Sequence, residues 1–206
     1  MPDSLVAVNE SMRRRVATFF SADTDRDVSN GKRVTSGGNY NALMLALRYV
    51  YVLALVIWLG GMVTLGALVA PTTFQILEAI EPSTGRALAG EVFGTTIARF
   101  HYVAYAAGGL LLVTLAAMTR LSPRPAGYAV RSALVTLMLA AALYSGLVVL
   151  TRIDAIQRDV GGLASSLPAG DTRRVEFDGL HLLSTRLMML NMIGGLALLY
   201  WEARAR

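Results

Sequence analysis

The stretch YVYVLALVIWLGGMVTLGALVA, Tyr49–Ala70, contains no charged residue and decides the class of fold. A helix needs roughly 20 residues to cross about 30 Å of hydrocarbon, and this stretch is long enough. Backbone amides cannot remain unpaired in lipid, so an open strand is excluded. The stretch therefore predicts a transmembrane helix.

Three further apolar blocks follow along the chain, at His101–Met118, Ala133–Leu150 and Leu182–Tyr200. With their flanks, the four blocks predict spans at about 43–70, 99–120, 131–152 and 180–201. We expect an all-α integral membrane protein, an antiparallel four-helix bundle over residues 41–206. Small residues four positions apart, such as Asn191 and Gly195, predict close packing of the helices.

Composition supports the membrane class, because 54% of the residues are hydrophobic and only 16% are charged. Four spans and their loops leave no room for a second globular domain. The basic residues lie mainly in the arm, in the loops and near the ends of the spans, so an orientation signal explains the net charge of +5 better than nucleic-acid binding. Cysteine is absent, which excludes disulfides and thiolate chemistry.

Basic residues predict the orientation. Arg and Lys are enriched before the first span, and the connection between spans two and three adds Arg120, Arg124 and Arg131 with no acid beside them. Loops rich in Arg and Lys usually remain in the cytoplasm, so both termini are expected on the cytoplasmic side. The expected location of the protein is a bacterial inner membrane. The other two connections then face outward.

Residues 1–40 form an arm and tether in this prediction. Apolar residues recur at helical spacing around Arg13, Arg14 and Arg15 and reach Phe19 and Phe20. This pattern is typical of a basic amphipathic helix that lies on the inner leaflet or docks on a partner. A disordered tail with accidental periodicity is the alternative.

Turn residues predict the limits of the helices on the outward side. Pro71 is expected to end the first span, followed by a short interfacial helix up to Ile80. The third span is expected to continue as a water-exposed helix until Gly161-Gly162, and Asp171 to cap the helix that becomes span four.

Two histidines, His101 and His181, open spans two and four at similar predicted depths. Facing imidazoles can clasp haem iron, or bind copper or zinc with help from Asp178 or Glu91. The alternative is that each ring only contacts headgroups, water or a carboxylate. We expect no resident cofactor, with haem b or copper as the alternatives.

Arg186 lies inside the fourth span, where a guanidinium costs roughly 2.5–3.5 kcal/mol. It should therefore face the bundle and pair with Asp154, Glu91 or backbone carbonyls. Arg186 either forms an anion or substrate site in an outward cavity or, as the favoured alternative, belongs to an ion pair that locks spans three and four together. Arg99 is similar but close enough to water to snorkel.

Methionines after His181 raise the question of a copper site. Met188 lies two turns away from it, roughly 10 Å along the helix, so one ion cannot bind both. Core packing explains these methionines better.

The sequence contains no nucleotide-binding loop, metalloprotease helix or nucleophile elbow, so we expect no enzymatic activity.

Several short segments carry a resemblance to a known family. They are Trp58-Leu59-Gly60-Gly61-Met62, Ala70-Pro71, Gly90-Glu91-Val92-Phe93, Arg99-Phe100-His101 and Phe177-Asp178-Gly179-Leu180-His181, with Ser184, Arg186 and Asn191. Over residues 42–204 the chain resembles a DUF4149-like bacterial family of four-span membrane proteins, allied to a human transmembrane protein linked to cisplatin resistance. A more distant likeness is to the copper-resistance D family. The resemblance implies a membrane bundle without an established activity, and the long arm departs from the family pattern.

Three functions are compatible with these features. The favoured one is a non-enzymatic accessory or binding subunit that docks on other membrane subunits, with an outward ligand site near His101, His181 and Arg186. The second is a small transporter or metal-handling protein. The third is an electron-transfer protein with bis-histidine haem b.

Overall fold

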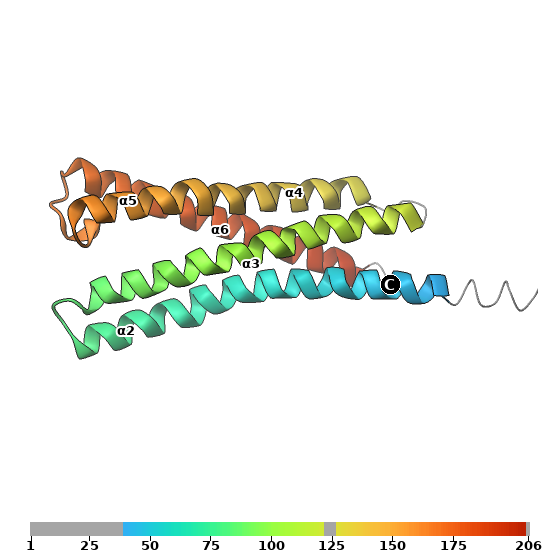
Figure 1. Ribbon diagram of the computed structural model, residues 1–206, viewed down its shortest axis with the longest axis horizontal. Helices are drawn as coiled ribbons and strands as arrows, with labels where there is room; N and C mark the ends of the chain where they lie inside the picture. Colours follow the sequence, from blue (N-terminus) through green and yellow to red (C-terminus); the bar gives the residue numbers. More distant parts are fainter. Residues whose placement is uncertain (1–38, 122–126, 205–206) are drawn as a thin grey trace, which may run out of the picture. The chain divides into compact units, whose positions relative to one another are not determined.

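The computed structural model describes residues 39–121 and 127–204, and all regular structure in these ranges is helical (Figure 1). Four of these helices are long and apolar enough to cross a membrane: Asn39–Ile80, Gly85–Leu121, Tyr128–Val160 and Thr172–Arg204. The all-α, four-helix prediction is confirmed. The expected arm lies outside the described residues, and with it Arg13, Arg14, Arg15, Phe19 and Phe20.

Each long helix contains its predicted span and extends beyond it. The first ends as a π-helical segment η1 (Leu65–Val69) and helix α2 (Ala70–Ile80), and the second is α3 (Gly85–Leu121). The third consists of α4 (Tyr128–Tyr144), the π-helical η2 (Ser145–Val149) and α5 (Leu150–Val160). A short 3₁₀ turn, η3 (Ala164–Ser166), precedes α6 (Thr172–Arg204).

Pro71 does not end the first helix, contrary to the prediction. It occupies the first turn of α2, directly after η1, where the backbone amide of Ala70 donates to the carbonyl of Leu65. A proline removes a donor and clashes with the carbonyl four residues earlier. The wider π-helical turn before it relieves that conflict, so the helix continues to Ile80.

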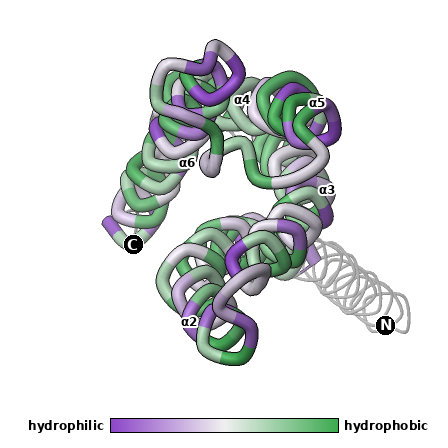
Figure 2. Tube along the Cα trace, turned by 90° about the vertical axis from the view of Figure 1, so that its left-hand side faces the viewer, coloured by the Kyte–Doolittle hydropathy of each residue, from purple (hydrophilic) through white to green (hydrophobic). Residues whose placement is uncertain are grey.

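The described helices of residues 47–206 pack as antiparallel neighbours. Helix α3 contacts both α2 and α4, and α6 contacts α4 and α5, whereas α2 and α6 have no comparable contact (Figures 1 and 2). Their interior contains Leu55, Trp58, Leu111 and Val135, all fully buried. We call the end with the connections 81–84 and 161–171 the Pro82 end, and the opposite end the Gly127 end.

Figure 2 views the molecule from the Pro82 end and shows hydrophilic residues in the nearest connections. Here α5 ends as expected at Gly161, which has a positive φ of 68°. The amide of Gly162 donates to the carbonyl of Gln157 across 3.3 Å, which closes the helix C-terminus. The expected stop signal is confirmed.

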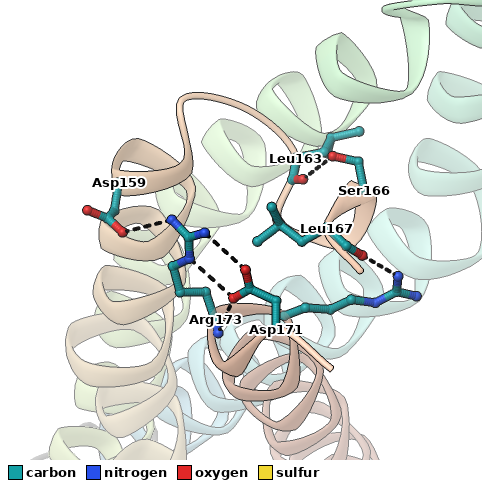
Figure 3. Close-up of polar contacts among 7 residues, drawn as sticks. Asp159, Leu163, Ser166, Leu167, Asp171 and Arg173 are labelled. Carbon is teal, nitrogen blue, oxygen red and sulfur yellow. Dashed lines mark hydrogen bonds and ion pairs between the residues drawn. The ribbon is translucent and has the colours of Figure 1, made fainter. Parts of the chain in front are cut away.

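The connection from α5 to α6 is held by polar contacts (Figure 3). A carboxylate oxygen of Asp171 accepts a 2.8 Å hydrogen bond from the backbone amide of Arg173, as an N-cap does. The Arg173 guanidinium pairs with the same carboxylate at 3.0 Å and with Asp159 at 3.5 Å. These bonds to Arg173 lower the pKa of Asp171 below its usual value.

Candidate functional site

A cavity of about 260 Å³ lies among the four long helices, on the side of the Pro82 end. Among the described residues, its lining contains aromatic, thioether, hydroxyl, amide and imidazole side chains but no charged one. The residues that line it are Trp58, Met62, Leu65, Gly66, Ala70, Phe93, Ile97, Phe100, His101, Ala104, Ala142, Ser145, His181, Ser184, Thr185, Met188 and Asn191. Both histidines of the chain therefore border one space.

His101, on α3, has a defined tautomer. Its Nδ1 lies 2.9 Å from the carbonyl oxygen of Ile97. Because a carbonyl only accepts, this contact places a proton on Nδ1, and in the neutral ring Nε2 then keeps a lone pair for a hydrogen-bond donor or a metal ion. The ring packs against Gly146 of η2, and a Cβ at that position would lie 2.6 Å from His101 Cδ2. Gly146 thus allows this close approach.

His181, on α6, is more exposed than His101. Its ring stacks on Phe177, with centroids 6.1 Å apart and planes inclined by 13°. The Thr185 hydroxyl donates across 3.0 Å to the His181 backbone carbonyl and lines the same cavity. The ring contact with Phe177 lies on α6 itself, so this helix supplies a contact of the imidazole at the cavity edge.

Asn191 is a cavity residue that the sequence analysis named for helix packing and for the family resemblance but not as a site residue. Its side chain is 4% exposed, and its Oδ1 has no hydrogen-bond partner within the described residues. A buried amide oxygen without a protein partner is costly, and a bound water or ligand is the usual explanation. The sequence could have indicated this role, because Asn191 is a polar residue among the apolar residues of span four.

Glu91 and Asp154 do not join the histidines. They line a second, more open groove of about 770 Å³ between the start of α3 and α5. Asp178 is exposed and lies 3.8 Å from Arg174, one turn earlier on α6. Among the described residues, no group of three or more His, Asp or Glu side chains is arranged to hold a metal ion. The expected carboxylate help at the histidines is therefore not seen.

Arg186 does not face the bundle, contrary to the prediction. It is exposed on α6, and no described residue pairs with it; Arg99 on α3 is exposed in the same way. Ion pairs between the third and fourth long helices involve other residues, and one of them is formed by Arg152 Nε and Glu176 Oε1, 2.6 Å apart. This pair lies farther toward the Pro82 end, where water is closer.

At the Gly127 end, three charged side chains that the prediction missed form one cluster. Glu202 on α6 and Arg131 on α4 are 8% and 6% exposed, and Arg131 Nη1 donates to Glu202 Oε2 across 3.0 Å. Arg48 of the first span pairs with the other carboxylate oxygen and donates to the Glu202 backbone carbonyl across 3.2 Å. Three spans thus meet at one carboxylate.

Four long apolar helices around an uncharged cavity define a polytopic membrane protein with four transmembrane helices. The family model of the domain of unknown function DUF4149 matches residues 53–161, more than half of the chain, and the chain belongs to this family. No curated protein and no solved structure matches the chain. The DUF4149-like resemblance is confirmed, whereas the relations to the human protein and to copper-resistance D remain predictions.

Proposed function

We propose that this protein is a non-enzymatic binding subunit of a bacterial inner-membrane assembly and holds a small ligand in the cavity that His101 and His181 line. One observation carries the proposal: imidazoles from two helices border one uncharged cavity together with a buried, unpartnered Asn191 oxygen. A bundle optimised only for packing would fill this space with apolar side chains. Retained buried polar groups therefore support binding.

The lining restricts the chemistry of the ligand. His101 Nε2 and Asn191 Oδ1 both present lone pairs, so a complementary ligand carries N–H or O–H donors or is a metal ion. Within the part of the chain that the structure describes, no carboxylate lines the cavity to offset a high positive charge. The volume of about 260 Å³ is below the roughly 300–1,000 Å³ of sites for drug-sized ligands, which argues against haem b.

The chain offers a direct experiment, because it contains only two histidines. Full-length protein labelled with ¹⁵N-histidine in lipid nanodiscs is titrated with ammonium, copper(I) and zinc(II). We expect His101 to show the Nδ1–H tautomer and one probe to shift the signals of both imidazoles. Asn191→Leu, which removes the unpartnered oxygen, should weaken that response. Shifts confined to the more exposed His181, or none for any probe, would contradict the shared site.

The assembly role rests on the basic arm and needs its own test. Deletion of residues 1–38 should release the protein from a larger complex on a native gel, because the arm supplies the predicted docking residues. The four long helices begin after this segment, so the deletion leaves them intact. Unchanged migration of the complex would contradict docking through the arm.

A specific observation favours transport as the second candidate. Two spans carry π-helical turns, and both turns line the cavity, through Leu65 and Gly66 in η1 and Ser145 in η2. Such turns are frequent at functional sites, and interrupted spans are typical of transporters. Uptake of the responding probe into vesicles should fall in His181→Ala if the cavity is a transport site. Equal uptake by wild type and variant would exclude that role for His181.

A further inference from the structure

Helix α6 presents an exposed stripe on the side opposite its buried face. It comprises Leu182, Arg186, Met189, Ile193, Leu196 and Tyr200, which we call the Arg186 stripe. Ile193 is 67% exposed and Tyr200 64%. The buried residues of the same helix, such as Gly194 and Leu198, face the bundle. The stripe is therefore available to whatever surrounds the protein in the membrane.

The spacing of the stripe is that of a helix–helix seam. Its members alternate four and three residues apart, from Leu182 to Tyr200, which is the a/d repeat of interdigitating helices. An apolar face alone would be equally compatible with lipid. Arg186 favours a protein partner over lipid, because it places a charged side chain at one seam position among apolar residues.

Arg186 lacks a counter-charge within the described chain, and charged side chains inside spans usually face protein and pair. A guanidinium binds a carboxylate through two parallel hydrogen bonds, which makes an acidic side chain its best partner. A second copy packed through the same stripe with two-fold symmetry would bring Arg186 against Arg186. Like charges at that depth disfavour this arrangement.

We propose that the Arg186 stripe docks a transmembrane helix of another protein, and that this helix carries an Asp or Glu at the depth of Arg186. The proposal rests on the assembly role proposed above and not on the cavity, since Arg186 does not line it. The proposal specifies which face of α6 contacts the partner and which side chain the partner contributes. The arm and the stripe would then be two separate contacts with the assembly.

The chemistry is tested with a defined probe, an apolar helical peptide of about 20 residues with one glutamate at the depth of Arg186. Full-length protein in vesicles carries a dye on an Ala203→Cys substitution, which is selective because the chain has no cysteine. Energy transfer should show about tenfold tighter association of this peptide than of its glutamine counterpart. Arg186→Met should abolish the preference, and Arg99→Met, the matched exposed arginine on α3, should retain it.

Equal association of the two peptides with wild type, or an unchanged preference in Arg186→Met, would overturn the proposal and indicate an arginine that only reaches headgroups.

In cells that make the protein natively, a photo-crosslinking residue at Ile193 should give an adduct that Arg186→Met removes. A photo-crosslinking residue at the exposed Val113 of α3 should not give this adduct. The cross-linked segment must be a transmembrane helix with Asp or Glu; adducts only with lipid or a second copy overturn the proposal. The native gel of the arm deletion reports the assembly role separately, and the two histidine signals report the cavity, so failure of each proposal is distinguishable.

Discussion

Arg131 on α4 and Glu202 on α6 form a buried ion pair, with the guanidinium Nη1 3.0 Å from the carboxylate Oε2. Arg48 pairs with the same carboxylate, so one negative charge serves two positive ones. Because Arg131 is only 6% exposed, water cannot easily compensate its guanidinium, whereas Arg48 is partly exposed. This carboxylate joins three of the four spans at the Gly127 end.

Neutralising this carboxylate tests its importance. Glu202→Gln leaves Arg131 buried without a counter-charge, and we expect the free energy of unfolding to fall by about 3–5 kcal/mol. Denaturant unfolding in detergent, followed by tryptophan fluorescence, measures the loss. Glu78→Gln is the matched control, because it breaks the exposed 3.3 Å pair with Arg86 and should cost at most about 1 kcal/mol. Similar losses in both variants would contradict the buried cluster.

The start of α6 should depend on pH through Asp171. Hydrogen bonds from Arg173 lower the pKa of Asp171 in the folded state, so its stabilising effect is complete above the ordinary aspartate pKa of about 3.9. The effect is lost as the pH falls through the lowered folded pKa. Amide exchange at Arg173 and Arg174 should therefore accelerate in acid, after correction for intrinsic rates.

Asp171→Asn separates the charge from the cap. Asparagine also caps helices but does not titrate, so the variant should lose the acid dependence of exchange while the helix still begins at Thr172. An acid response of the same size in Asp171→Asn would assign the effect to another group.

The spans were predictable because the length of an apolar run decides whether a helix can cross lipid, whatever its neighbours are. The stop at Gly161 and the cap at Asp171 were predictable for a similar reason, since both depend on local backbone chemistry. Pro71 was misjudged because the π-helical turn that accommodates it has no sequence signature of its own.

The rotation of each helix was harder to predict. In a membrane the outer face of α6 is as apolar as its buried face, so periodicity could not show that Arg186 points away from the bundle. The histidines were correctly selected as notable residues, but their common cavity depends on tertiary packing. Glu202 had a usable signal, because it is the only acid among the basic residues that end spans at the Gly127 end.

The C-terminus of α5 provides a local test of backbone strain. Gly161 has a φ of 68°, and nothing lies within 4 Å of the position that a Cβ would take, so Gly161→Ala adds strain without a clash. Side chains disfavour this conformation by roughly 1–2 kcal/mol, and the midpoint of thermal unfolding should fall accordingly. Gly162→Ala, which also meets open space but has no positive φ, should change it little. Equal effects would mean that the turn is not in the left-handed conformation.

Gly146 is a position where the third span packs closely against His101. A Cβ there would lie 2.6 Å from His101 Cδ2 and would also overlap the Tyr105 hydroxyl, so Gly146→Ala must displace both rings. Such overpacking typically costs about 1–3 kcal/mol, and the ¹⁵N signals of His101 should shift while those of His181 change less. Gly109→Ala is the matched control on α3, because nothing lies within 4 Å of its Cβ and alanine favours the helix. It should keep both histidine spectra and the unfolding midpoint. If Gly146→Ala also leaves the His101 signals unchanged, His101 does not pack against the third span, and the cavity lacks the wall that orients its Nε2.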